Sequence, residues 1–115
     1  MNHGKENVKP VVARIWRGQV VANRADEYAD YLYEHGIRPL EEKAVGVQLF
    51  REDREADSEF VTISYWESIE AMSRFAGKDP TRIHHLPRDP EFLIELPKTV
   101  QVLAIATSYG RTGWG

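Results

Sequence analysis

The sequence contains no cysteine among its 115 residues, and this absence removes several functional classes together. Disulfides, thiolate metal sites and cysteine nucleophiles all require a residue type that the chain does not have. The chain also lacks a run of eighteen apolar residues, so no membrane-spanning helix is expected. Its first ten residues, MNHGKENVKP, have no apolar stretch typical of a signal peptide. We therefore expect a cytoplasmic protein.

An excess of positive charge is missing as well. Fifteen basic residues stand against eighteen acidic ones, which gives a net charge of −3. This balance argues against a surface for nucleic acid or for an anionic membrane. The sequence shows no glycine-rich nucleotide loop, no GxSxG nucleophile motif and no HExxH zinc motif. We predict no nucleic-acid partner, no membrane partner and no metal site built from local sequence.

The length of the chain indicates one domain. The polar residues 1–9 are expected to form a disordered N-terminal tail, residues 10–109 the folded domain, and residues 110–115 a C-terminal tail. A chain this short buries only about two-thirds of its unfolded surface, so association with a second subunit would help its stability.

Alternating apolar residues predict four strands, at residues 11–21, 45–50, 61–66 and 100–109. A first helix is expected from a cap at Asn23 to a stop at Gly36, followed by a connection over residues 38–44. Residues 51–59 read as a charged hairpin turn. A second helix follows Ser68 and ends at Gly77, and a short helix begins at Asp89-Pro90. The order βαββαβ predicts an α+β fold, the ferredoxin-like plait.

Both faces of the first predicted strand carry bulky side chains. Ala13 and Ile15 lie on one face, and Arg14 and Trp16 lie on the other. Helices cover one face of such a sheet, so the second face needs another cover. We therefore predict a homodimer that buries this second face.

The second predicted helix places Ile69, Met72 and Phe75 on one face. That spacing predicts that Met72 and Phe75 are core residues.

An aromatic set is the first candidate for a ligand site. A cavity that is lined by aromatic side chains and a few polar groups suits a flat substrate, although the same residues would also suit an ordinary core. The set comprises Trp16, Phe50, Tyr65, Trp66 and Phe75.

A polar group is the second candidate. Arg14 shares a strand face with Trp16, and Gln48, Tyr31 and Arg82 add polar side chains. His35 and the pair His84-His85 are candidate bases or ligands, because imidazole works as a base near neutral pH and binds metals. Solvated surface histidines remain the alternative for each of them.

Three segments, ARIWRG, SYWESIEAMSRFAG and EFLIELPKTV, resemble the antibiotic biosynthesis monooxygenase family of small dimeric α+β barrels. The resemblance spans about residues 10–107. It implies that two ferredoxin-like plaits form a dimeric α+β barrel. It also implies a cofactor-independent monooxygenase that acts on a small aromatic or polyketide-like molecule. In that chemistry His84 or His35 is the base, and Arg14 or Gln48 stabilises the oxyanion. Trp16, Gln48, Phe50, Tyr65 and Trp66 are then expected to contact the substrate.

A haem-degrading branch of the same family implies an alternative. That branch uses an asparagine on the first strand, a tryptophan on the second helix and a histidine after it. In this sequence His84 matches the histidine, whereas Trp16 and Phe75 occupy the other two positions. Haem held by His84 is therefore the alternative cofactor. A third alternative is a dimer that binds a small molecule without catalysis.

Overall fold

A four-stranded antiparallel sheet forms the framework of the computed structural model, which describes residues 8–110. The strands are β1 (Val12–Val21), β2 (Gly46–Asp53), β3 (Asp57–Trp66) and β4 (Gln101–Ala104), and they lie in the order β2-β3-β1-β4. With the helices inserted between them, this order confirms the predicted α+β, ferredoxin-like plait. The charged hairpin turn is tighter than expected, because only residues 54–56 separate β2 from β3, and β4 is shorter than residues 100–109.

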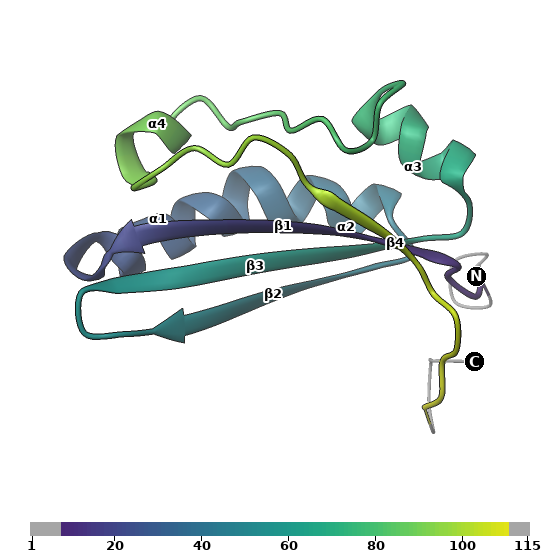
Figure 1. Cartoon of the computed structure of the whole chain (residues 1–115), viewed down its shortest axis with the longest axis horizontal. Coiled ribbons are helices and arrows are strands. Elements are labelled where there is room, and N and C mark those ends of the chain that lie inside the picture. Colours follow the sequence, from purple (N-terminus) through teal and green to yellow (C-terminus); the bar gives the residue numbers. More distant parts are fainter. Residues whose placement is uncertain (1–7, 111–115) are drawn as a thin grey trace.

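All the described helices lie on one side of this sheet (Figure 1). They are α1 (Ala25–Leu32), η3 (Tyr33–Ile37), α2 (Arg38–Lys43), α3 (Ile69–Ala76) and α4 (Asp89–Phe92), with a short 3₁₀ turn, η2 (Ala22–Arg24), before α1. None of these described helices is long and apolar enough to cross a membrane.

The first helix does not stop at Gly36, and this prediction was wrong. The chain stays helical through η3, a wide π-type turn in which the Arg38 amide donates to the Tyr33 carbonyl, and continues into α2. Pro39 follows this turn. Proline has no N–H to donate and crowds the carbonyl four residues earlier, so the helix widens instead of ending. Asn23 does not cap the helix either, because it lies within η2 and α1 has no side-chain cap.

Helix α3 begins and ends as predicted. The Ser68 hydroxyl accepts a hydrogen bond from the Ala71 amide at 3.0 Å, and Gly77 adopts a φ of 94° at the other end. Its buried face is narrower than expected: Met72 is fully buried, but Phe75 is 37% exposed and Ile69 is 50% exposed. The prediction that Phe75 is a core residue was therefore wrong. The helix lies over the end of the sheet, so only the side that meets Trp66 is covered.

Two apolar clusters form the core between sheet and helices. One surrounds Tyr28, Phe60 and Phe92, and the other surrounds Trp66 and Met72. The strand register places Phe60 opposite Gly18 and Trp66 opposite Val12, so the clusters sit toward opposite ends of the β1–β3 pair. The strand positions between them lie at the centre of the helix-facing side.

No described helix covers the other face of the sheet (Figure 1), and several of the side chains on this face are apolar. Ile15 pairs with Ile63, and Phe50 pairs with Val61 on the same face. Phe50 is 46% exposed and Leu103 is 45% exposed. We call this surface the open face.

Candidate functional site

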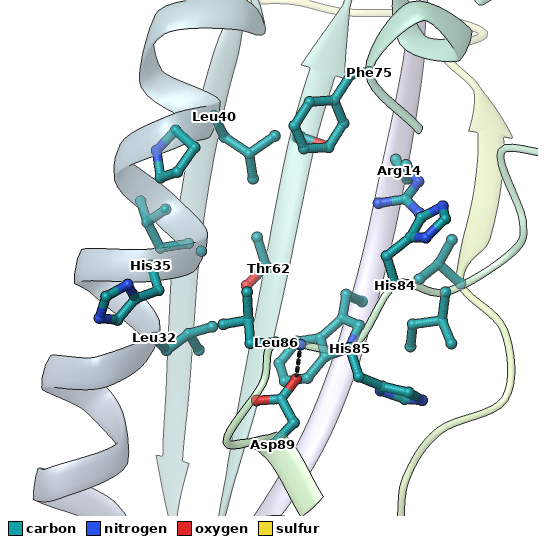
Figure 2. A pocket seen from close by; sticks show the side chains of 17 residues that line it. Arg14, Leu32, His35, Leu40, Thr62, Phe75, His84, His85, Leu86 and Asp89 are labelled. Carbon is teal, nitrogen blue, oxygen red and sulfur yellow. Dashed lines mark hydrogen bonds between the residues drawn. The ribbon is translucent and has the colours of Figure 1, made fainter. Parts of the chain in front are cut away.

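A pocket of about 360 Å³ lies between the two core clusters, on the helix-facing side of the sheet. Figure 2 shows the helical wall on one side and the segment that follows α3 on the other. We call this segment, residues 77–100, the covering segment. The pocket is lined by Arg14, Trp16, Leu32, His35, Gly36, Ile37, Pro39, Leu40, Thr62, Ser64, Phe75, Ile83, His84, His85, Leu86, Asp89 and Val100.

Four residues of β1 and β3 form the floor of this pocket. Arg14 stands opposite Ser64, and Trp16 stands opposite Thr62. All four project to the same face, because side chains alternate along a strand and residues directly opposite share a face. The ring of Trp16 lies over Gly18, where an added Cβ would come within 2.5 Å of Trp16 Cη2. Glycine at this position therefore leaves room for the indole.

Arg14 connects the floor to the covering segment. Its Nε donates to the Pro80 carbonyl at 2.9 Å, and its Nη2 donates to the Arg82 carbonyl at 3.0 Å. Burial lowers the pKa of Arg14 from its ordinary value, but a guanidinium stays charged at neutral pH. Within residues 8–110, no ion pair involves Arg14. The pocket floor thus carries a cation, Arg14, that no described carboxylate neutralises.

His84 extends from the covering segment toward Arg14, as Figure 2 shows. Its Nε2 lies 3.1 Å from the Ala76 carbonyl oxygen. A carbonyl oxygen only accepts hydrogen bonds, so in a neutral His84 ring this contact assigns the proton to Nε2 and the lone pair to Nδ1. His84 can therefore accept a proton through Nδ1.

His35 lies on the helical wall, in η3. Its ring packs against Tyr31, with ring centroids 4.9 Å apart. Figure 2 shows His35 and His84 on opposite walls of the pocket. The structure therefore brings both predicted bases to one pocket and places only His84 beside Arg14.

Sequence reasoning missed three polar residues of the pocket, Thr62, Ser64 and Asp89. Thr62 is 8% exposed, and its Oγ1 is the buried side-chain oxygen of the described residues that lacks a hydrogen-bond partner. The signal was a threonine in a strand whose alternate positions, Phe60 and Trp66 among them, are buried. A side chain at such a position points toward the helices, where its hydroxyl cannot form a hydrogen bond to bulk water.

Asp89 is 2% exposed, and both of its carboxylate oxygens are occupied. One accepts from the Tyr28 hydroxyl at 2.9 Å, and the other accepts from the Leu86 amide at 2.9 Å. Burial and the nearby Asp89 charge raise the pKa of Tyr28, so this hydroxyl stays protonated and remains a donor. Asp89 therefore fixes the covering segment against α1.

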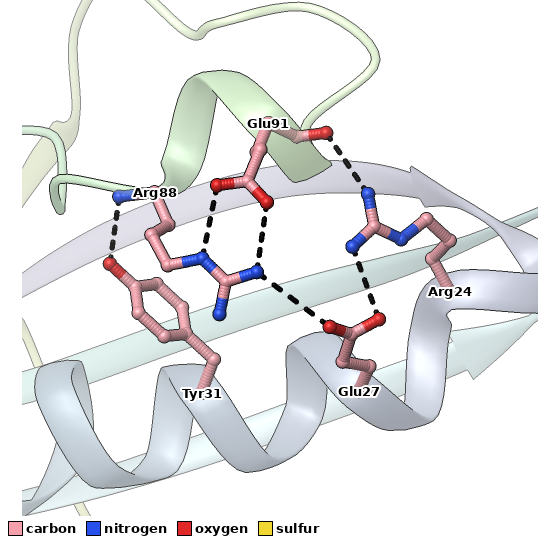
Figure 3. Close-up of polar contacts among 5 residues, drawn as sticks. All are labelled: Arg24, Glu27, Tyr31, Arg88 and Glu91. Carbon is pink, nitrogen blue, oxygen red and sulfur yellow. Dashed lines mark hydrogen bonds and ion pairs between the residues drawn. The ribbon is translucent and has the colours of Figure 1, made fainter.

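A surface network reinforces this attachment (Figure 3). Arg88 pairs with Glu91 at 2.8 Å and with Glu27 at 3.7 Å, and Arg24 pairs with Glu27 at 3.1 Å. The Arg88 amide also donates to the Tyr31 hydroxyl at 2.8 Å. Each exposed pair contributes little alone, but together they hold α4 over α1.

Four of the predicted substrate contacts do not line the pocket. Gln48, Phe50 and Tyr65 project to the open face, where the Tyr65 hydroxyl donates to Gln48 Oε1 at 2.7 Å. Trp66 faces the helices but is 1% exposed, because the second core cluster encloses it, and its Nε1 donates to Ser64 Oγ. Of the aromatic set, Trp16 and Phe75 line the pocket.

Over residues 8–110, no group of three or more His, Cys, Asp or Glu side chains is placed to hold a metal ion. His84 donates from Nε2 to Ala76, so iron binding through that nitrogen would require this hydrogen bond to break. The ring as it stands does not fit a haem ligand through Nε2.

Comparisons with known proteins support the fold. No family model matches the chain, and no curated protein matches it. Among solved structures, the chain is similar to a candidate antibiotic biosynthesis monooxygenase from Bacillus cereus, with a TM-score of 0.62 and 17% sequence identity. The match covers 88% of this chain and 98% of the other. The chain thus has the fold of that protein.

Proposed function

We propose that the protein is a cofactor-independent monooxygenase-like enzyme that acts on a small aromatic or polyketide-like molecule. The observation that carries this proposal is the pocket itself. Its lining is mostly apolar and partly aromatic, and it includes the cation of Arg14, which has no ion pair among the described residues, next to the imidazole of His84. Its volume of about 360 Å³ lies in the range of small-molecule sites. The similarity to the Bacillus cereus structure is consistent with this function.

In the proposed chemistry the aromatic side chains, the histidine and the arginine have separate roles. Trp16 and Phe75 hold a flat ring, and His84 Nδ1 removes a proton from an electron-rich phenol in the pocket. The resulting anion reduces dioxygen and forms a C–O bond to it, and loss of water from the hydroperoxide breaks the O–O bond and leaves a quinone carbonyl. The protein's task is to position the substrate and stabilise developing negative charge. Arg14 supplies that stabilisation, because a fixed cation in a partly buried site acts more strongly than one in water.

Loss of the base is expected to slow the reaction strongly. His84→Ala should lower kcat by about 10²–10⁴-fold, since this is the usual contribution of a positioned general base. The assay is oxygen consumption with hydroquinone-like and anthrone-like phenols. His85→Ala is the matched control and should retain activity, because the His85 imidazole makes no hydrogen bond to the other described residues, whereas His84 is held by the Ala76 carbonyl. Trp16→Ala should chiefly raise KM.

The same variants test His35 as the competing base. If His35→Ala is inactive and His84→Ala is active, the base is on the helical wall. Wild-type rates in His84→Ala, His35→Ala and Trp16→Ala alike, with intact circular dichroism, would contradict an active site in this pocket.

The haem alternative comes from the position of His84 and is tested separately. If the monooxygenase proposal is right, addition of haem should not give a sharp Soret shift that His84→Ala abolishes. Such a shift, lost in His84→Ala and retained in His85→Ala, would favour the haem-binding alternative. Ligand binding without oxygen consumption or a Soret change would favour the non-catalytic dimer.

A further inference from the structure

Two polar groups of the pocket are not satisfied by the described protein. Thr62 Oγ1 is buried, lines the pocket and has no hydrogen-bond partner. Buried hydroxyls in folded proteins nearly always have a partner, because an unpaired one is costly. A ligand oxygen in the pocket would supply that partner.

Arg14 is the second group. Its Nε and Nη2 are directed at the carbonyls of Pro80 and Arg82, which fixes the plane of the guanidinium. Among the residues that the structure describes, no acceptor is present for Nη1 and no carboxylate forms an ion pair with Arg14. A partly buried cation of this kind favours an anion with hydrogen-bond acceptors.

The sheet register brings the two groups within reach of one ligand. Arg14 is directly opposite Ser64, so Thr62 is its diagonal neighbour on β3, on the same face. Diagonal positions lie about 7–8 Å apart at the backbone, so one ligand group on this face can lie between the Arg14 guanidinium and the Thr62 hydroxyl. Among the described residues that line the pocket, Asp89 is the one acidic side chain, and both of its oxygens are occupied. Figure 2 shows it beyond Thr62 on the side away from Arg14.

We propose that Arg14 and Thr62 form a carboxylate-binding subsite, and that the ligand of the pocket is an aromatic ring system bearing a carboxylate. A carboxylate has two oxygens, one for each donor. It is also ionised at neutral pH without help, whereas a phenol with a pKa near 10 is not. This inference rests on the proposed function for the view that the pocket is the substrate site.

The test measures binding of 2-naphthoate to the full chain by calorimetry in oxygen-free buffer, with 2-naphthamide as the neutral analogue of the same shape and 2-naphthol as the phenol. Wild-type protein should bind 2-naphthoate at least about tenfold more tightly than either analogue. Thr62→Val keeps the side-chain shape and should weaken 2-naphthoate about tenfold, as expected for one hydrogen bond to a charged group. Its melting temperature should not fall, because the variant removes an unpaired buried hydroxyl.

The second part of the test removes the charge of Arg14 and repeats the calorimetry. Arg14→Gln should bind 2-naphthoate no more tightly than 2-naphthamide, and Arg14→Lys should keep part of the difference. Arg17→Gln is the control, because Arg17 pairs with Val61 on the open face and should leave binding unchanged. Circular dichroism checks that each variant is folded.

Several results would overturn the subsite. They are no binding of 2-naphthoate by the wild type at millimolar concentration, equal affinity for 2-naphthoate and 2-naphthamide, tighter binding of 2-naphthol, or unchanged affinity in Thr62→Val. The last result would mean that a water molecule satisfies the hydroxyl. Binding is measured without oxygen and so does not depend on turnover. If 2-naphthoate binds as expected but the phenols of the separate oxygen-consumption assay do not react, the monooxygenase proposal fails and the carboxylate subsite stands.

Discussion

Replacing Trp66 with alanine is expected to lower the free energy of unfolding by about 3–5 kcal/mol, the usual cost of removing a fully buried aromatic side chain. Trp66 is 1% exposed and packs against Met72 and Leu40 in the second core cluster. Its Nε1 also donates to Ser64 Oγ, so the variant leaves that hydroxyl short of a donor. The loss of packing and the loss of this hydrogen bond act in the same direction.

Phe75→Ala is the matched comparison, because the two rings touch. Their centroids lie 5.4 Å apart, yet Phe75 is 37% exposed at the pocket. Its removal should cost only about 1 kcal/mol, the scale of a single aromatic pair. Urea unfolding followed by circular dichroism measures both changes. Equal costs for the two variants would show that α3 is packed differently from the structure described above.

A glutamate in place of Ile63 is expected to convert a dimer into a monomer. Ile63 lies at the centre of the open face, between Ile15 on β1 and Gln48 on β2. We propose that a second copy of the chain covers this face, as the unpartnered apolar side chains indicate. A specific interface should bury more than roughly 1,000 Å² in total. A carboxylate placed within it would lose its hydration without gaining a partner, which costs several kcal/mol.

Light scattering at micromolar concentration measures the outcome. The wild type should have twice the chain mass of 13.2 kDa, and Ile63→Glu should have the mass of a single chain. Ile69→Glu is the control, because Ile69 is 50% exposed on α3, on the helical side of the sheet, and should stay dimeric. A wild type that is monomeric under these conditions would contradict the homodimer.

The strand pattern made much of the fold predictable. Alternation along residues 12–16 placed Arg14 and Trp16 on one face, and the register bears this out. Alternation defines two faces but does not say which of them the helices cover. For that reason Phe50 and Tyr65 were expected in the pocket, although the structure places them on the open face.

Other features could not be predicted because they depend on contacts distant in sequence. Gly36 is a normal helix stop in isolation, whereas in the fold the chain continues through it as a wide turn that lies beside Leu86. The role of Asp89 depends on Tyr28, a residue 61 positions away. Strand alternation could place Thr62 inward, but it could not show that its hydroxyl has no hydrogen-bond partner there.

The floor of the pocket consists of paired strands, whereas the covering segment opposite it is mostly irregular backbone. Arg14, Thr62 and Trp16 belong to the ladder of β1 and β3. The covering segment is irregular for most of its length and is anchored where Phe92 and Leu93 enter the first core cluster and where Asp89 accepts from Tyr28. Irregular segments accept changes in length and sequence that a strand ladder does not. If the proposed carboxylate subsite on the floor is right, changes in the covering segment should alter the size and shape of the ligand that binds, while the floor continues to hold the carboxylate. Substitutions that retune which ring is accepted should accordingly be concentrated in residues 78–88.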